Sequence, residues 1–553
     1  MSPPLAQSLA LLIATWVAWR VLRRLVAKDP FATIPGPPSA SRLAGKMMDI
    51  INPETAAEYL DGLTKTYGGV FRCYGLFNAD SLYVYDPKAL YQIIVKDQHI
   101  FEESGDFLRT NATILGKQLT GTVGDHHRKQ RKMLNPVFSI AHMREMTPIF
   151  YSIGRKLRES IGQQVSNDGN EIDLLPWMTR SALELIGQSG FGYSFDNLDV
   201  GGEEHAFARS AKNINGTLAD PLISMVRILV WPLVYGWGSP AFQRTVVDWL
   251  PWKKLHELRD MTDVVNKTAI EVFESTKRSL KEGRDISTRA GGGKDIMTVL
   301  LKANMSASEE DRLPEDELIA QISGMTFAGM ETTSNALSRV LHLLSEHPEV
   351  QEKLRKEVRD AYASHDGDLD YDTLTALPLL DAVCRESLRL YAPLPLLLRE
   401  AREDGILPLF RPIRSTSGEE IKEVFVPKGT TLFISLHHCN RNPEIWGLDA
   451  AEWKPERWLE PLPDTVAEAK VPGVYSNLMT FLGGGRACIG FKFAQLEMKV
   501  VLSLLLERFQ FAPGEKEIVW LNNGIVQPST KDAPLSSTGR RELGMPLKVS
   551  VAP

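Results

Sequence analysis

The sequence is poor in cysteine and has no excess of positive charge. Its 553 residues include four cysteines, at positions 73, 384, 439 and 488, which are too widely spaced for a disulfide framework or a zinc pattern. A formal net charge of -6 gives no polycationic surface, so nucleic acid is not expected as a partner. Internal repeats and low-complexity tracts are also missing. With 43% hydrophobic and 24% charged residues, the composition is that of a globular protein and selects no function by itself.

Two nucleotide-binding motifs are absent as well. No Gly-x-Gly-x-x-Gly follows a strand-like run, so a nicotinamide or flavin domain of that type is not expected. A glycine-rich run ends at Gly490, and Phe491 stands between that glycine and Lys492. A phosphate-binding loop needs the lysine directly after the glycine, so this run is not predicted to bind phosphate.

The same glycine-rich run contains an isolated cysteine. It reads Phe481-Leu-Gly-Gly-Gly-Arg-Ala-Cys488-Ile-Gly490 and leads into an apolar helical pattern. The N–H groups of a helix that begins near Cys488 would stabilise a thiolate and lower the thiol pKa. Gly484 and its neighbours would let the backbone lie close to a flat cofactor, and Arg486 could meet a carboxylate as a rigid fork. The alternative is a small, buried structural cysteine.

A long helical pattern between positions 313 and 348 has polar residues in its middle, Ala328-Gly-Met-Glu-Thr-Thr333. Gly329 beside Ala328 leaves room for a small ligand. The Thr332 hydroxyl can donate to the Ala328 carbonyl and loosen the helix. Glu331 and Thr332 place an acid and an alcohol on one turn, where they could pass protons to a bound group. The alternative is a solvated helix face.

These two motifs together resemble the signatures of the cytochrome P-450 monooxygenases, Phe-x-x-Gly-x-Arg-x-Cys-x-Gly and Ala/Gly-Gly-x-Asp/Glu-Thr-Thr. The resemblance implies haem b, with Cys488 as the thiolate ligand of its iron, and implies catalytic roles for Thr332 and Glu331. Six further residues of the two motifs are then expected at the haem: Phe481, Gly484, Arg486, Gly490, Ala328 and Gly329.

Two more elements resemble this family. Glu386 and Arg389 are three residues apart and can pair on a helix, and Arg457 in Pro455-Glu-Arg457-Trp458 would complete a buried structural triad. A weak surface pair is the alternative for the first two. The role expected for all three is folding and haem retention.

A basic segment after Gly124 resembles the family's helix that binds a haem propionate. His127 stands where a tryptophan is usual, and Arg131 follows in the expected place. Arg399 matches another propionate contact. The residues from Arg128 to Lys132 form either a solvated basic face or a patch that docks an acidic electron donor.

The expected fold is mainly α with a smaller β region. Helical spacing is seen in Val350, Leu354, Val358 and Ala361, and strand-like runs cover 81–85 and 431–435. The order of motifs over about residues 35–550 resembles the cytochrome P-450 fold, and no doubly wound parallel pattern is evident.

The N-terminus predicts a single membrane anchor. Residues 5–22 are almost wholly apolar and would span ~27 Å as a helix. Arginines and a lysine at the end of this run keep the rest of the chain cytosolic by the positive-inside rule. We therefore expect an anchor at 1–28, a Pro-rich hinge at 29–44 and a catalytic domain at 45–553. The resemblance adds an endoplasmic reticulum membrane location, and a buried core helix is the alternative.

The resemblance implies a haem-thiolate monooxygenase that acts on a hydrophobic small molecule. A terpenoid, sterol, fatty acyl or polyketide-like substrate is expected, in fungal secondary metabolism, with lining residues in 107–119, 326–329, 394–398 and 523–526. Electrons would come from NADPH through a separate NADPH-cytochrome P-450 reductase, and a part for cytochrome b5 stays open. The alternatives are a haem-thiolate isomerase or dehydratase, which has no use for Glu331 and Thr332, and a non-catalytic haem-binding protein.

Overall fold

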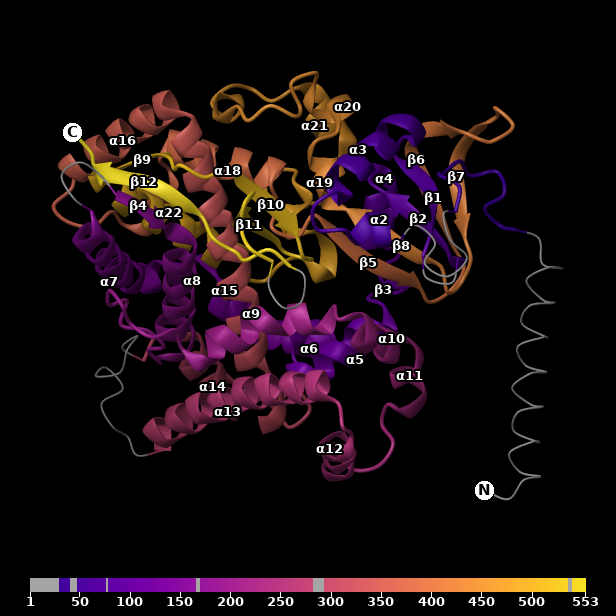
Figure 1. The fold of residues 1–553 in the computed structure, drawn as a ribbon, viewed down its shortest axis with the longest axis horizontal. Coiled ribbons are helices and arrows are strands. Elements are labelled where there is room, and N and C mark those ends of the chain that lie inside the picture. The colour runs from indigo at the N-terminus through magenta and orange to yellow at the C-terminus, as the bar shows by residue number, and fades with distance from the viewer. Residues whose placement is uncertain (1–28, 40–46, 76–77, 166–169, 282–292, 536–539) are drawn as a thin grey trace.

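A computed structural model describes residues 29–39, 47–75, 78–165, 170–281, 293–535 and 540–553 (Figure 1). The predicted anchor at 1–28 and part of the predicted hinge lie outside these ranges. None of the helices in the described ranges is long and apolar enough to cross a membrane.

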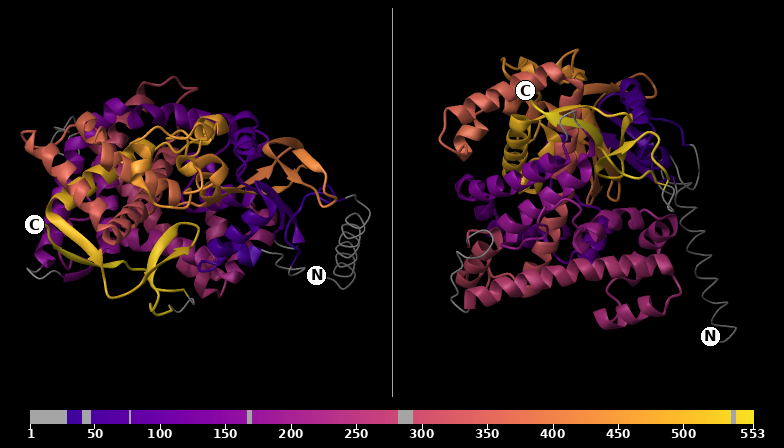
Figure 2. Two further views of the ribbon diagram at one scale, coloured as in Figure 1. Left: turned by 90° about the horizontal axis from the view of Figure 1, so that it is seen from above. Right: turned by 60° about the vertical axis from the view of Figure 1, so that its left-hand side comes forward.

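Helices make up most of the fold, as expected (Figures 1 and 2). Those before residue 250 are α2 (Met47–Ile51), α3 (Ala56–Tyr67), α4 (Pro87–Tyr91), α5 (Gly105–Ile114), α6 (Gly124–Leu134), α7 (Ile140–Gln164), α8 (Leu174–Leu185), α9 (Ala206–Leu218), α10 (Pro221–Leu229), α11 (Trp231–Val234) and α12 (Pro240–Trp249). Those after it are α13 (Lys253–Lys281), α14 (Ile296–Ser306), α15 (Glu315–Glu346), α16 (Pro348–Ala363), α17 (Tyr371–Thr375), α18 (Pro378–Leu390), α19 (Leu436–Asn440), α20 (Pro443–Trp446), α21 (Asp464–Ala469) and α22 (Phe491–Arg508).

The strands form a smaller part, gathered in separate sheets. One sheet has the order β1-β2-β8-β5-β3, and another has the order β4-β12-β9. Two antiparallel pairs, β6-β7 and β10-β11, stand apart from both. The bounds are β1 (Val70–Tyr74), β2 (Asp80–Val84), β3 (Phe101–Glu102), β4 (Asn170–Asp173), β5 (Leu396–Ala401), β6 (Gly405–Arg414), β7 (Glu420–Val426), β8 (Thr431–Ser435), β9 (Phe509–Pro513), β10 (Ile518–Asn522), β11 (Val526–Thr530) and β12 (Pro546–Val551).

Periodicity located several of these elements correctly. The strand-like runs at 81–85 and 431–435 coincide with β2 and β8, which pair in parallel in the first sheet. The helical spacing after position 348 coincides with α16, where Val350, Leu354 and Val358 are buried. Repeated apolar positions indicate which face of an element packs on the core, so these predictions are confirmed.

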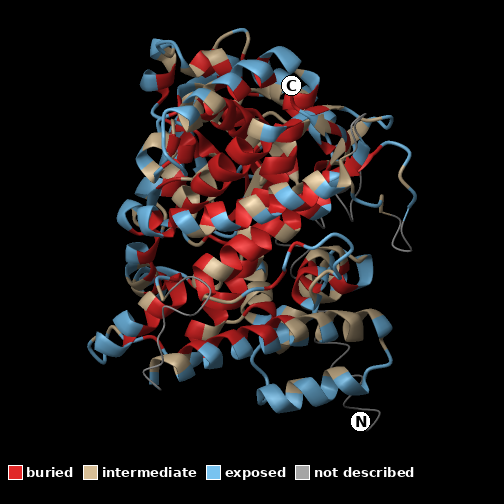
Figure 3. Ribbon diagram, turned by 90° about the vertical axis from the view of Figure 1, so that its left-hand side faces the viewer, coloured by how far each residue is buried: buried red, intermediate tan, exposed pale blue. Residues whose placement is uncertain are grey.

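Helix α15 runs through the centre of the helical region. Acidic residues occupy its first turn and suit the positive end of the helix dipole, and Pro314 caps it. Its sides pack on α8, α13, α16, α18, α22 and β9, and most of its side chains are buried, as the inner helices in Figure 3 illustrate. The middle of this helix is therefore positioned by protein on almost every side.

The start of the predicted hinge packs on the folded body. Phe31 and Ile34 are buried, and the Pro35 carbonyl accepts a hydrogen bond of 2.9 Å from the Arg72 amide in β1. A Cβ at Gly36 would lie 2.1 Å from the Arg72 carbonyl oxygen, so only glycine allows this close approach. Residues 29–39 thus extend the body, while the predicted division into anchor, hinge and catalytic domain stays a prediction.

Candidate functional site

The cysteine loop between α21 and α22 is held by a backbone hydrogen bond and by aromatic packing. The Cys488 amide donates to the Phe481 carbonyl at 2.8 Å, which closes the loop. The Phe481 ring packs against Tyr475 and Phe491. Helix α22 begins at Phe491, three residues after the cysteine, as the sequence pattern predicted.

Cys488 borders an internal space. Its side chain keeps accessible surface, although dense protein surrounds it. This enclosure raises the pKa of the Cys488 thiol, and an N–H of Gly490 and the Arg131 guanidinium act in the opposite direction. The expected lowering of the thiol pKa is therefore wrong for the protein groups alone, because desolvation outweighs both.

Three glycines of the loop, at positions 483, 484 and 485, lie where a Cβ would collide with protein atoms. At Gly484, where φ is +61°, a Cβ would lie 2.3 Å from the Ile94 carbonyl oxygen. A Cβ at Gly483 would likewise meet the Pro472 carbonyl oxygen, whereas a Cβ at Gly485 would meet the side-chain Oε1 of Gln98 at 2.6 Å. Only Gly490 faces open space. The missing side chain of Gly484 thus makes room for protein backbone, and the predicted contact of this glycine with a cofactor stays a prediction.

Three arginines that the sequence selected converge on this region. Arg131 on α6 donates to the Ala487 carbonyl at 2.6 Å, directly before the cysteine. Arg486 donates to the Thr122 carbonyl at 2.7 Å, and its buried Nε has no hydrogen-bond partner. Arg399 on β5 is buried and donates to the Leu398 carbonyl at 2.9 Å.

Two glutamates that sequence reasoning missed bind these arginines. Glu103 lies 3.0 Å from Arg486 and 3.3 Å from Arg399, and Glu102 on β3 lies 3.2 Å from Arg486. Burial raises the pKa of Glu102, whereas for Glu103 the two arginines outweigh burial and lower its pKa. No motif marked them, because the pairs with Arg486 join segments more than 380 residues apart and the pair with Arg399 joins segments almost 300 residues apart.

His127 is buried on α6 beside the same arginines. Burial, Arg486 and Arg131 lower the pKa of its imidazole to about 4, so the ring is neutral at ordinary pH. The ring makes no hydrogen bond to another described residue. A neutral imidazole has one N–H donor, so it can still bind an anionic oxygen.

The middle of α15 exposes one short face to an internal space. Ala328 and Thr332 keep accessible surface within a helix that is otherwise largely buried. The predicted hydrogen bond from the Thr332 hydroxyl to the Ala328 carbonyl is present at 2.8 Å. The helix continues through this turn without a break. A Cβ at Gly329 would contact Ile186 at 3.5 Å, and the role of this glycine at the haem stays a prediction.

Glu331 lies beneath this face as a buried acid. Its Oε2 accepts a hydrogen bond of 3.0 Å from Gln527 on β11, a partner that no sequence motif indicated. Burial raises the pKa of the Glu331 carboxyl, while Lys212 and the Gln527 bond lower it and Glu204 raises it. A carboxyl that holds its proton above its usual pH range can donate that proton.

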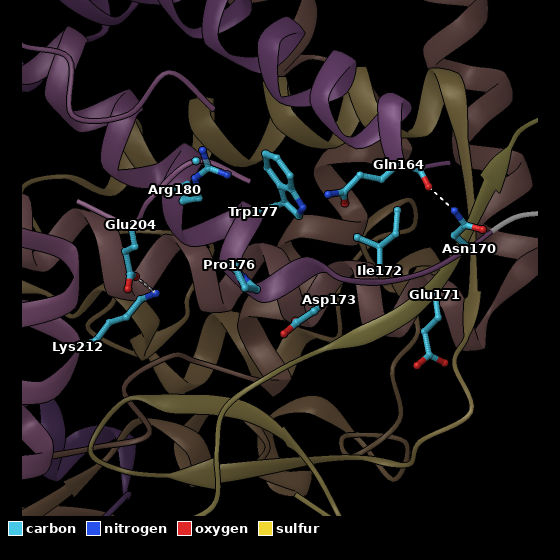
Figure 4. Close-up of a pocket in the computed structure, with 11 residues that line it drawn as sticks. Gln164, Asn170, Glu171, Ile172, Asp173, Pro176, Trp177, Arg180, Glu204 and Lys212 are labelled. Carbon is cyan, nitrogen blue, oxygen red and sulfur yellow. Dashed lines mark hydrogen bonds and ion pairs between the residues drawn. The ribbon is translucent and has the colours of Figure 1, made fainter. Parts of the chain in front are cut away.

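Lys212 and Glu204 line a pocket of about 800 Å³ between β4 and α8 (Figure 4). The pocket also contains Trp177 and Arg180, and none of the predicted site residues lines it. Its connection with the site is electrostatic, through the effect of this ion pair on Glu331.

The predicted structural triad is assembled. Arg389 makes two hydrogen bonds of 2.8 Å to Glu386, and both side chains are fully buried. Arg457 lies 3.3 Å from the same carboxylate, and Trp458 donates to it at 2.9 Å. The remaining guanidinium N–H groups of Arg389 meet carbonyls, those of Asn440 and Ala450 among them, so the buried charges are satisfied. Their part in haem retention stays a prediction.

The residues present suit a haem with a thiolate ligand. One accessible thiol lies in an enclosed space, and the orphaned Nε of Arg486 and the neighbouring Arg131, Arg399 and His127 supply donors for two propionate groups. This donor set defines the class of haem-thiolate proteins.

Comparison with known proteins agrees with this class. The family model described as Cytochrome P450 matches residues 35–533. Cytochrome P450 monooxygenase 91 of Postia placenta is 48% identical over 535 residues, which cover 97% of this chain and 96% of that protein. A ganoderic acid synthetase of Ganoderma lucidum is 41% identical, with 93% and 94% covered, and a cytochrome P450 monooxygenase of Hericium erinaceus is 35% identical, with 98% and 97% covered. The chain belongs to the cytochrome P450 family and is a monooxygenase of the oxidoreductase class.

Proposed function

We propose that this monooxygenase inserts one oxygen atom from O2 into a C–H bond of a hydrophobic small molecule. The second oxygen atom leaves as water, with two protons and with two electrons that NADPH supplies through a separate reductase. The observation that carries the proposal is the accessible turn of α15, where Thr332 lies beside the buried acid Glu331. When bound, the haem would supply the oxygen activation.

The side chains around that turn have distinct parts. Cys488 would hold the iron, and Arg131, Arg399, Arg486 and His127 would hold the propionates. Thr332 keeps its hydroxyl at the accessible face by donating to a carbonyl of its own helix. Glu331 stores a proton because burial favours its neutral form, and Gln527 orients the carboxyl. The pair would thus deliver protons where oxygen is reduced.

The test is oxygen incorporation from ¹⁸O2 by the purified full-length enzyme with NADPH and NADPH-cytochrome P-450 reductase, with and without cytochrome b5. One labelled oxygen atom in the product, together with dependence on NADPH, is the expected result. Product that forms without NADPH would favour a haem-thiolate isomerase or dehydratase. A normal thiolate spectrum without any turnover would favour a haem-binding protein.

For the substrate we propose a terpenoid, a sterol or a similar molecule of fungal secondary metabolism. The segments expected to line the substrate space are rich in aliphatic residues, with Leu394 and Leu396 to Leu398 as one example. A relative that is 41% identical carries the name ganoderic acid synthetase, which supports this choice. Soret titrations with a panel of such compounds test it, and the absence of any spectral shift would contradict it.

We further propose that the enzyme resides on the endoplasmic reticulum membrane, with a single N-terminal span and a cytosolic catalytic domain. Support comes from exposed apolar side chains on and around α10–α12, where Leu233, Trp237 and Trp249 are 71%, 69% and 85% exposed. Large apolar patches of this kind indicate contact with a partner or a membrane. We expect the enzyme to stay in microsomes after carbonate washing. We also expect added protease to digest its catalytic domain in intact vesicles. Release by carbonate or full protection would contradict this topology.

The basic segment of α6 gives less support for reductase docking than its sequence suggested. Arg128 pairs with Asp125, and Lys132 lies 3.0 Å from Asp311, although both basic side chains are largely exposed. The pairs neutralise part of the charge, so we propose the reductase partner from the chemistry of the reaction and not from this patch.

A further inference from the structure

Arg339 on α15 is a cation inside the fold without an acidic partner. Its guanidinium carbon lies 4.2 Å from the ring centre of Tyr391 and 3.4 Å from that of Trp520, so it is held between two aromatic rings. It makes no hydrogen bond and no ion pair with any other described residue. Dense protein surrounds the side chain, yet part of its surface stays accessible.

A second arginine faces the same tyrosine. The guanidinium carbon of Arg441 lies 5.5 Å from the Tyr391 ring centre. Its Nη1 donates to His437 Nε2 at 2.8 Å, and its buried Nε has no acceptor. Burial and Arg441 keep the pKa of His437 far below its ordinary value, so this ring is a neutral acceptor and supplies no counter-charge.

The carboxylates nearest to these arginines are engaged elsewhere. Glu346 is half exposed and lies 3.8 Å from His342, and Asp61 accepts a hydrogen bond of 2.8 Å from His438. Neither forms an ion pair with Arg339 or Arg441 in the described part of the chain. Burial lowers the pKa of Arg339 to about 9, the direction expected when positive charge is left uncompensated in the interior.

A metal ion does not explain this cluster. Asp61, His437 and His438 lie close enough to share a metal, but their ligand atoms are occupied. His438 bonds Asp61 through Nε2 and Tyr83 through Nδ1 at 2.8 Å, and His437 Nε2 accepts from Arg441. The positive charges of Arg441 and Arg339, which both act on His437, would also repel a cation. The net positive charge of the cluster favours the binding of an anion.

The cluster adjoins the segments predicted to line the substrate space. The Val526 amide, in the hairpin that carries Trp520, donates to the Pro393 carbonyl at 2.9 Å, two residues after Tyr391. The His437 amide donates to the Pro395 carbonyl at 3.1 Å. Arg339 follows Thr332 by about two turns of α15, or roughly 10 Å along the helix axis. A ligand end bound here would thus stay within reach of the proposed oxygen site.

We propose that Arg339 and Arg441 bind a carboxylate, and that the hydrophobic substrate of this enzyme carries it. The inference rests on the proposed function and narrows its substrate class to amphiphilic acids. A guanidinium fixed between aromatic rings presents its N–H groups as a preorganised fork, which matches the two oxygens of a carboxylate. The aliphatic lining would hold the remainder of the molecule.

The test compares two probes of equal chain length by equilibrium dialysis of the solubilised full-length holoenzyme. The probes are ¹⁴C-labelled decanoate and ¹⁴C-labelled decan-1-ol. We expect decanoate to bind at least about ten times more tightly, which corresponds to about 1.4 kcal/mol. Arg339→Gln and Arg441→Gln should bring this ratio close to one without changing the affinity for the alcohol, and Arg339→Lys should keep part of it.

Arg411→Gln is the matched control, because Arg411 is 64% exposed and has no part in the proposed site. The ratio of decanoate affinity to decanol affinity in this variant should equal that of the unaltered enzyme. Each variant is first checked for its thiolate spectrum, and the ratio in the unaltered enzyme tests the proposal even if a variant fails to fold. Equal affinities, no binding of either probe, or a ratio that persists in both glutamine variants would overturn it. If ¹⁴C-acetate binds as tightly as decanoate with the same arginine dependence, the site takes a small free anion and the substrate assignment is refuted. Because dialysis needs no turnover, failure here is distinct from failure of the monooxygenase proposal.

Discussion

Replacing Gly484 with alanine separates two explanations for the glycine-rich loop. If the glycine serves only to admit a cofactor, an added methyl group would reduce haem content and leave the stability of the polypeptide fold unchanged. The structure predicts the opposite. The backbone of Gly484 has φ +61°, and its Cβ would lie 2.3 Å from the Ile94 carbonyl oxygen and 3.4 Å from the Val95 Cα.

The expected loss of stability has two parts. A non-glycine residue in the left-handed region costs about 1–2 kcal/mol. Overpacking against backbone atoms, which cannot rotate away, costs typically about 1–3 kcal/mol more. The predicted decrease in the free energy of unfolding is therefore about 2–5 kcal/mol.

Urea unfolding of the holoenzyme, followed by far-ultraviolet circular dichroism and by the carbon monoxide difference spectrum, measures this effect. The fraction of Gly484→Ala protein that remains folded should keep a normal thiolate spectrum. Gly62→Ala is the control, since Gly62 is exposed within α3 and no atom lies within 4 Å of an added Cβ. This variant should increase the free energy of unfolding by roughly 0.5–1 kcal/mol. A Gly484→Ala enzyme with unchanged stability and little haem would refute the packing explanation.

Four further substitutions test other parts of the site. Thr332→Ala should form less product while NADPH consumption continues, and unchanged coupling would contradict its part in proton delivery. Cys488→Ser should lose the thiolate-type Soret band of the reduced carbon monoxide complex, and a retained band would disprove the ligand assignment. Arg389→Met should lower the free energy of unfolding by about 3–5 kcal/mol, because it removes a fully buried partner of Glu386; a loss below 1 kcal/mol would show that the pair is dispensable. Glu497→Gln should stabilise the protein increasingly as pH rises. Burial without hydrogen-bond partners raises the pKa of the Glu497 carboxyl, so the folded state keeps a proton that the unfolded state loses above about pH 4.5. The free energy of unfolding of the native enzyme therefore falls by up to about 1.4 kcal/mol per pH unit. Urea titrations at pH 5 and pH 8 that show the same difference between variant and native enzyme would exclude this.

Local patterns predicted the parts of the fold in which one segment decides its own structure. The spacing of Val350, Leu354 and Val358 located α16, and short strand-like runs located β2 and β8. The long helix after position 313 was also predicted, and α15 covers Glu315–Glu346. Each of these depends on contacts among residues close in sequence, which is why the pattern carries the information.

The site was predictable only where a motif concentrates its chemistry. Cys488, Thr332 and Glu331 stand in compact motifs, whereas Gln527 reaches Glu331 from a distant hairpin and is one glutamine among many. Glu102 and Glu103 likewise meet their arginines only because β3 and the cysteine loop fold together.

The sequence by itself determined the family, the positions of α15, α16 and the start of α22, and the cysteine that would bind the iron, because these depend on residue identity and short-range spacing. The tertiary structure alone decided that the missing side chain of Gly484 makes room for the protein backbone, that the thiol pKa is raised and not lowered, and that Arg339 and Arg441 both face Tyr391 without an acidic partner. Desolvation, close approach and charge compensation depend on which distant segments surround a group, and no local pattern records those neighbours.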